Sequence, residues 1–216
     1  MRNRFDEQLG MLKKKMIEMS AICEEMIAKA SHALLNGDAD LAGQVVTDGE
    51  GIGRSEREIE SLCVKLLLQQ QPVAGDLRQI SAALKMVTDI ERIGDQAEDI
   101  AEIIPFLKGE EFENSSLIRK MAEAAIQMVN RSIDAYVSQN AELARDVIRQ
   151  DDIVDGLFLE MKKLLIRMIS ETPGRGEFAL DILMISKYFE RIGDHAVNIA
   201  EWVIYSVTGE LKGEAE

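Results

Sequence analysis

The chain contains an internal repeat, and this feature limits its fold more than any other. Residues 91–102 read ERIGDQAEDIAE and residues 190–201 read ERIGDHAVNIAE, so nine of twelve positions are identical at a spacing of 99. An earlier segment, 32–52, aligns without gaps with 134–154 at a spacing of 102. The spacing falls by three between these segments, so the second copy has the shorter connection. The 216 residues are therefore predicted to form two tandem copies of roughly 100 residues each.

Each copy has the pattern of three long helices joined by short loops. In the first copy the turn Asn36-Gly37-Asp38 ends one helix and offers a cap for the next, and Pro72 and Gly75 break that second helix. Asp76 is a good N-cap for the third helix, which continues to Ile104. Short loops make neighbouring helices antiparallel. We expect an all-α protein of two tandem, pseudo-symmetric three-helix bundles, with repeats at 1–107 and 108–216 and helices at about 5–35, 39–70, 76–104, 116–138, 140–171 and 177–207.

The third helix of each copy carries an apolar stripe with a 3.6-residue period, which predicts the core face of its bundle. The stripe consists of Ala83, Val87, Ile90, Ala97, Ile100 and Ile104 in the first copy, and of Ile182, Ile185, Phe189, Ile192, Ala196, Ile199 and Val203 in the second. It indicates packing and says nothing about function.

Composition supports a helical fold and excludes several functions. Apolar residues are 46% of the chain and aromatics only 5%, with 3 prolines, which disfavours an all-β protein. The net charge of −14 makes nucleic acid an unsuitable partner, because binding phosphates needs clustered Lys and Arg. No apolar run approaches the ~18 residues that a bilayer span needs. The N-terminus MRNRFDEQLGMLKKK lacks the apolar stretch of a signal peptide, so we expect a cytoplasmic protein.

The acidic residues of the third helices are the candidate functional residues. Glu91 and Asp95 are four apart, and Glu98 and Glu102 continue the row. In the second copy the row is Glu190, Asp194 and Glu201, with Val197 at one position. Like charges one turn apart repel by a few tenths of a kcal/mol, so a duplicated row of them suggests a cation. Carboxylates are hard ligands that suit Mg, Ca, Mn or Fe. The alternative is a solvated acidic face with ion pairs to Arg92 and Arg191.

Other residues near the rows have a structural and a functional interpretation. Gly94 and Gly193 lie within helices, where glycine costs about 1 kcal/mol relative to alanine. Close helix packing is the favoured explanation, and access of a partner to the acidic row is the other. His195 replaces Gln96 of the first copy and is interpreted as a packing residue rather than a ligand. Cys23 and Cys63 are interpreted as buried apolar residues, since they lack CxxC spacing.

Sequence motifs of catalysis are absent. The chain has no GxSxG, no phosphate-binding glycine-rich loop and no Glu-x-x-His of the kind that di-iron bundle enzymes use. We therefore expect a protein that acts by binding and is not an enzyme. Two alternatives stay open: a carboxylate-bridged metal enzyme on a helical bundle, and a purely structural acidic scaffold.

The duplicated ERIGD block and the run QQPVAGDLRQISAALKMVTDIERIGDQAEDIAE at 70–102 closely resemble the PhoU family, and the resemblance covers about 5–207. It implies an all-helical, commonly dimeric, cytoplasmic negative regulator of phosphate uptake and phosphate-starvation signalling. Such proteins act with the ATPase of the phosphate-specific ABC transporter and with the phosphate-sensing histidine kinase, so this chain would meet a membrane only through its partners.

The resemblance also implies a metal site, since some family members bind metal clusters on acidic E/D-x-x-x-D motifs; Fe, Zn, Mn or Mg would be the candidate ions. The matching pairs here are Glu91/Asp95 and Glu190/Asp194, with Glu98, Glu102 and Glu201 as secondary residues. Members usually have an acidic residue or Asn in the middle of the second helix. Asp155 fills that place in the second copy, but Gly53 fills it in the first. The two sites are therefore expected to differ in affinity or nuclearity.

Overall fold

The structure is a computed structural model that describes residues 2–69, 73–107 and 115–210. Six α-helices account for nearly all of these residues, and no strand occurs among them. They are α1 (Arg2–Asn36), α2 (Ala39–Gln69), α3 (Ala74–Ile103), α4 (Ser115–Ser138), α5 (Ala141–Glu171) and α6 (Gly176–Thr208), with short 3-10 helices η1 (Ile104–Leu107) and η2 (Pro173–Arg175). The prediction of an all-α protein with six helices is confirmed.

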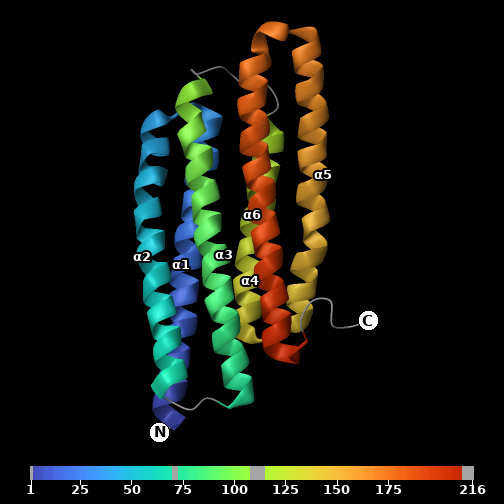
Figure 1. Ribbon diagram of the computed structural model, residues 1–216. Coiled ribbons are helices and arrows are strands. Elements are labelled where there is room, and N and C mark those ends of the chain that lie inside the picture. Colours follow the sequence, from blue (N-terminus) through green and yellow to red (C-terminus); the bar gives the residue numbers. More distant parts are fainter. Residues whose placement is uncertain (1, 70–72, 108–114, 211–216) are drawn as a thin grey trace.

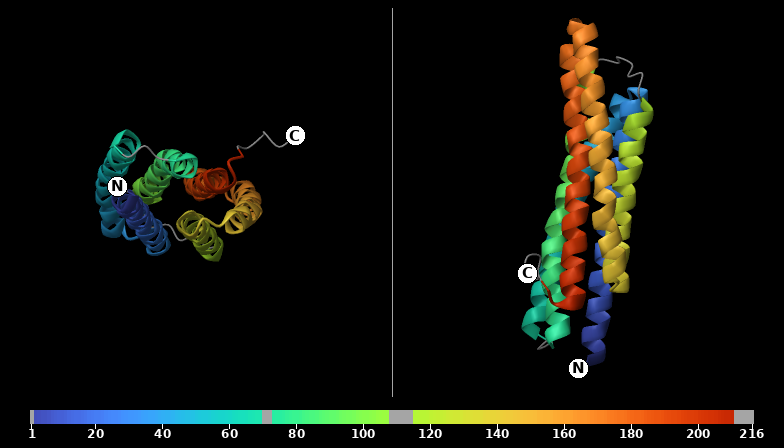
Figure 2. Two further views of the ribbon diagram at one scale, coloured as in Figure 1. Left: turned by 90° about the horizontal axis from the view of Figure 1, so that it is seen from below. Right: turned by 90° about the vertical axis from the view of Figure 1, so that its right-hand side faces the viewer.

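The helices form two antiparallel bundles that lie side by side (Figure 1). Helices α1, α2 and α3 contact one another, as do α4, α5 and α6. The bundles meet mainly through α3 and α6, and α1 also contacts α4. Figure 2 shows this along the helix axes, with α2 and α5 at the outer edges. The predicted division at 107/108 borders 108–114, which lie outside the described residues, and stays a prediction.

The predicted helix boundaries agree with the structure to within two residues, except at the start of α1, which begins at Arg2 rather than near residue 5. Helix α2 is continuous through its three central glycines. The predicted end of this helix at Gln70 and the break at Pro72 lie outside the described residues. Asp76 is not the N-cap: α3 begins at Ala74, with Val73 as N-cap. The Asp76 carboxylate instead accepts a hydrogen bond from the Val73 backbone N–H at 3.4 Å. An acidic side chain therefore still stabilises this helix start, from one turn inside it.

Equivalent turns start α2 and α5, which shows that the repeat extends to loop chemistry. Gly37 has φ +63° and Gln139 has φ +52°, so both turns pass through the left-handed region. Asp38 then accepts a hydrogen bond from the Leu41 backbone N–H at 2.9 Å, and Asn140 accepts one from Leu143 at 3.1 Å. Each cap satisfies an N–H group that the first turn of a helix leaves without a partner. The aspartate predicted as the cap of the second helix is confirmed.

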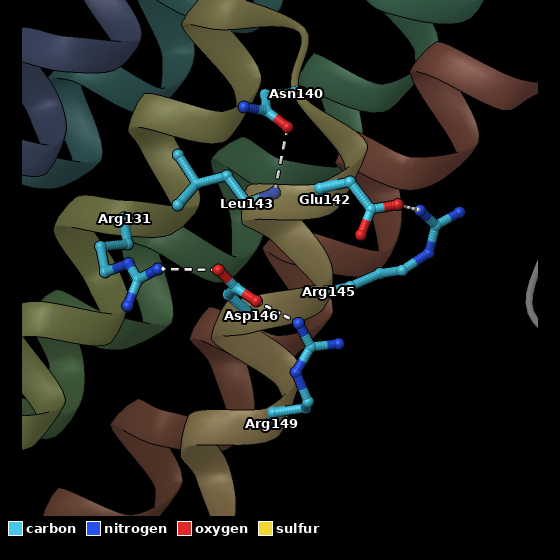
Figure 3. Close-up of polar contacts among 7 residues, drawn as sticks. All are labelled: Arg131, Asn140, Glu142, Leu143, Arg145, Asp146 and Arg149. Atoms are coloured by element: carbon cyan, nitrogen blue, oxygen red, sulfur yellow. Dashed lines mark hydrogen bonds and ion pairs between the residues drawn. The ribbon is translucent and has the colours of Figure 1, made fainter.

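Ion pairs fix α5 against α4 beyond this turn (Figure 3). Arg131 of α4 reaches Asp146 of α5 at 3.2 Å, and Arg149 pairs with the same carboxylate. Lys29 of α1, which is equivalent to Arg131, pairs with Asp48 of α2 at 2.8 Å. The two bundles therefore join their first two helices by the same kind of contact.

The core is continuous within and between the bundles. Every residue of the two apolar stripes predicted on α3 and α6 is buried. The cysteines are confirmed as buried and free. Three methionines of α1 are in the core, namely Met16, Met19 and Met26, whereas Met11 is 53% exposed. His32 of α1 is exposed.

Candidate functional site

The acidic row of the first bundle runs along α3 where this helix meets α2. Glu91 is half-buried and Asp95 is exposed, one helical turn away. Burial raises the pKa of Glu91, and the negative charges of Asp95 and of Glu56 from α2 raise it further. Burial also raises the pKa of Asp95, whereas the positive charge of Arg92 lowers it. The positive charge of Arg92 therefore acts on both carboxylates but does not offset their partial burial, and the expected ion pairs of Arg92 and Arg191 stay a prediction.

The row continues toward the C-terminal end of α3 through Glu98 and Glu102. Glu98 is half-buried and Glu102 is exposed. Burial raises the pKa of Glu98, and the charges of Glu102 and Asp95 add to the increase. The whole row is therefore a line of mutually repelling carboxylates in a partly desolvated position.

The second bundle brings together carboxylates from two helices. Asp151 of α5 lies close enough to Asp155 of the same helix, and to Glu190 and Asp194 of α6, for their charges to interact. Burial, followed by the charges of Asp155, Asp194 and Glu190, raises the pKa of Asp151 to about 6. One oxygen of Asp151, Oδ1, is buried and has no hydrogen-bond partner among the described residues. A buried carboxylate oxygen without a partner is unfavourable and suits a bound cation.

Asp151 is a candidate functional residue that the sequence analysis missed. A signal for it exists, because Asp151 and Asp155 are four apart, the spacing that singled out Glu190 and Asp194. Glu190 also forms an ion pair with Lys187 of the preceding turn. Glu201, the last residue of the predicted row, is half-buried two turns beyond Asp194.

The helical glycines allow close packing at both rows, but different atoms fill the space. A Cβ atom at Gly193 would lie 3.2 Å from Oδ1 of Asp151, so this glycine makes room for the buried carboxylate. A Cβ atom at Gly94 would lie 3.2 Å from the side chain of Ile52. Close packing is thereby confirmed as the role of both glycines. In the second bundle the packing also serves the acidic cluster.

Neither row is a preformed metal site. No group of three or more His, Cys, Asp or Glu side chains in the part of the chain that the structure describes is already arranged to hold a metal ion. The second-bundle cluster nevertheless fits a cation by its chemistry: four hard oxygen ligands, one of them with an unsatisfied buried atom. The first-bundle row lacks such an atom among the described residues.

His195 belongs to a buried polar cluster between the bundles. Its Nδ1 lies 2.9 Å from Oδ1 of Asp89, and Asn198 donates a hydrogen bond to the same oxygen at 3.1 Å. Asp89 is 8% exposed and His195 is 7% exposed. These contacts join α3 to α6 and support the interpretation of His195 as a packing residue.

A shallow groove lined mainly by basic side chains lies between α1 and α2. It is lined by Lys15, Arg54, Arg57, Glu58, Ser61, Leu62 and Lys65. Lys15 pairs with Glu58 at 2.6 Å, which leaves three basic side chains in excess. Residues 54, 58, 61 and 65 share one helix face, so the spacing could have revealed the groove.

None of the helices, over the residues described, is long and apolar enough to cross a membrane.

Comparisons with known proteins identify the relatives of this chain. The model of the PhoU domain matches residues 16–104 and 118–203. The chain is 35% identical over 211 residues to a "Phosphate-specific transport system accessory protein PhoU homolog" of Clostridium acetobutylicum, covering 97% of this chain and 96% of the relative. It is 36% identical over 206 residues to the protein of that name from Aquifex aeolicus, covering 95% and 93%.

Solved structures agree with these matches over the full fold. The crystal structure of PhoU from Pseudomonas aeruginosa superposes with a TM-score of 0.90 at 35% identity, covering 95% of this chain and all of that chain. The crystal structure of the phosphate transport system regulatory protein PhoU from Streptococcus pneumoniae has a TM-score of 0.88 at 26% identity, covering 96% and 98%.

Proposed function

This chain belongs to the PhoU family, and on that premise we propose that it regulates phosphate transport as an accessory protein of the phosphate-specific transport system. It restrains phosphate uptake and phosphate-starvation signalling when phosphate is plentiful. It does so by binding, as a cytoplasmic homodimer that links the ATPase of the phosphate ABC transporter to the phosphate-sensing histidine kinase. The observation that carries this proposal is the match to full-length relatives named as accessory proteins of that system.

Metal binding at the acidic rows is the second part of the proposal. The residues concerned are Glu91, Asp95, Asp155, Glu190 and Asp194, and Asp151 joins them because of its buried, unpartnered oxygen. A bound Fe, Zn, Mn or Mg ion would neutralise the repelling carboxylates and leave coordination positions for a phosphate or for a partner's carboxylate. The carboxylates of the two rows project from long helices. The helices would keep the acidic face in a defined arrangement for a partner.

A genetic complementation experiment tests the regulatory role. In a bacterium whose own gene of this family has been deleted, phosphate uptake is expected to continue without restraint in phosphate-rich medium. Expression of this chain is expected to restore the restraint, and an empty vector is the control. Equal uptake with chain and vector, at confirmed expression of the folded protein, contradicts the proposed function.

Elemental mass spectrometry tests the metal. Protein purified without chelator or affinity tag is expected to contain Fe, Zn, Mn or Mg, and the variant carrying Asp95→Asn with Asp194→Asn is expected to lose it. Binding to the folded state also stabilises that state, so the melting temperature in added metal should fall in the variant. Unchanged metal content and stability would show that the rows are not metal ligands.

A further inference from the structure

We propose that only the second bundle binds metal, and that the first bundle has lost this capacity and acts as an acidic surface alone. This inference rests on the metal binding proposed above and concerns which of the two rows performs it. It departs from the expectation that a duplicated motif makes two metal sites.

The first step concerns the ligands from the second helix of each bundle. The gapless alignment of 32–52 with 134–154 places Gly49 opposite Asp151. The position directly after its end places Gly53 opposite Asp155. Helix α5 therefore contributes two carboxylates one turn apart, and α2 contributes none at the same positions. A hard cation prefers six or more oxygen ligands, of which a single pair on one helix supplies only a few. The first bundle therefore has carboxylates at only two of the four positions that carry them in the second bundle.

The second step concerns what fills the places that the missing carboxylates would occupy. A Cβ atom built on Gly49 would collide with the carboxylate of Glu98, so this α3 side chain lies over the glycine. A Cβ atom on Gly53 would meet Nη1 of Arg57 at 3.6 Å, so a guanidinium covers the second vacant place. In the second bundle Val197 is equivalent to Glu98 and Leu159 to Arg57, and neither side chain carries a charge.

The third step concerns the contact between helices at the glycines. In the second bundle Gly193 faces Oδ1 of Asp151 at 3.2 Å and the side chain of Val154, the equivalent of Ile52, at 3.6 Å. In the first bundle the side chain facing Gly94 is Ile52, also at 3.2 Å. The same close approach therefore buries an acidic oxygen in one bundle and only hydrocarbon in the other.

The local charge follows the same asymmetry. Asp151 lies among the carboxylates of Asp155, Asp194 and Glu190. In the first bundle Arg57 adds a guanidinium beside Gly53 where the second bundle has Leu159, whereas Arg92 has its counterpart in Arg191. Lys187 pairs with Glu190 in the second bundle, so Arg57 is the basic side chain that distinguishes the first. Its guanidinium partly supplies the positive charge that a metal would otherwise provide, which opposes cation binding there.

Titration of Mn²⁺ and, separately, Zn²⁺ into protein stripped of metal tests the inference by calorimetry and elemental analysis. Asp151→Asn and Asp194→Asn are expected to lower the affinity at least about tenfold. Asp95→Asn, the matched change in the first bundle, is expected to leave it within about twofold. Equal losses for Asp95→Asn and Asp194→Asn would overturn the inference while leaving metal binding established. Absence of binding by the wild-type chain would overturn both.

A transplant provides the converse test. The variant Gly49→Asp, Gly53→Asp, Arg57→Leu and Glu98→Val places the second-bundle residues in the first bundle at all four positions. It is expected to double the number of metal ions bound, with its helical content checked by circular dichroism. Unchanged stoichiometry in the folded variant would show that these four residues do not decide the asymmetry, and would overturn the inference. If the variant does not fold, the single substitutions above decide alone.

Discussion

At the scale of single residues, Asp151 carries a charge that the folded protein disfavours. Its pKa is raised from an ordinary 3.8 to about 6, with burial as the main cause. Between these values the folded state binds more protons than the unfolded state. The stability that this protonation gives is therefore fully present below pH ~4 and is lost as the pH rises through ~6.

A pH series of urea unfolding in the presence of a chelator checks this assignment. Asp151→Asn is expected to unfold at higher urea than the wild type at pH 7, by about 1 kcal/mol, since solvent reduces the effect of a half-exposed charge. The two proteins are expected to become equally stable near pH 4. Asp152→Asn, an exposed neighbour, serves as control. A less stable Asp151→Asn protein at pH 7 would show that the carboxylate has a stabilising partner.

The cysteines provide a second prediction at this scale. Burial raises the pKa of both thiols, that of Cys63 to about 12, and Cys23 donates a hydrogen bond to the Ile90 carbonyl at 3.3 Å. Because the thiolate is the reactive form, a disulfide reagent at pH 8 is expected to modify neither thiol in the folded chain. Both should react at once in guanidinium chloride. Rapid modification of the native protein would contradict the burial of these side chains.

Glu91, Asp95, Glu190 and Asp194 could be singled out from the sequence because the spacing of like charges is visible in a single helix. Asp151 was missed although it lies four residues before Asp155, because its burial depends on α5 facing α6 and on the small surface of Gly193 opposite it. Such a relation between two helices has no one-dimensional pattern. The metal itself stays a prediction.

At the scale of the elements, α3 and α6 are held together by a polar contact within an otherwise apolar interface. Asp89 accepts from Asn198 and lies against His195, and all three groups are largely shielded from water. Removing the shared acceptor leaves two buried polar groups without it. This loss costs more than the net value of the hydrogen bonds, because the groups cannot regain water.

Asp89→Ala is therefore expected to reduce the free energy of unfolding by about 2–3 kcal/mol, measured in urea at pH 7. Asp99→Ala, on the same helix, is the control: burial and neighbouring acids raise the pKa of Asp99, so its removal should be neutral or stabilising. Equal stability of Asp89→Ala and the wild type would mean that the cluster does not hold the bundles together.

The elements themselves were largely predictable. Apolar periodicity, glycine turns and capping residues lie close together in the sequence and placed most helix ends within two residues. Asp76 shows the limit of this reasoning, because an acidic side chain stabilises a helix start as N-cap or from the first turn, and the two differ by three residues. The contact of Asp89 with His195 joins two residues that are 106 apart in the sequence, so no local sequence pattern could predict it.

At the scale of the whole molecule, the charge of −14 is unevenly distributed. The acidic rows lie on α3 and α6, whereas the basic groove lies between α1 and α2. Under the proposed function, the acidic face is the surface that meets a basic patch on the transporter ATPase. Attraction between exposed charges is screened by salt over a Debye length of ~10 Å at 0.1 M.

A pull-down of that ATPase by this chain is accordingly expected to weaken about tenfold between 50 and 500 mM salt. Arg54→Glu with Arg57→Glu changes the net charge by −4, from −14 to −18, and is expected to preserve or strengthen binding. Loss of binding in this variant would instead assign the partner to the basic groove. Binding that is indifferent to salt would contradict an electrostatic surface of either sign.

The contact between Asp89 and His195 also bears on the origin of the chain from a duplicated gene. Position 89 is equivalent to Tyr188 and position 195 to Gln96, so the mirrored contact would pair Tyr188 with Gln96, whose Oε1 has no hydrogen-bond partner among the described residues. Two copies of the first half would place Asp89 opposite Gln96, and two copies of the second would place Tyr188 opposite His195. Each half therefore supplies a different residue to this contact, and neither repeat alone carries both of its partners.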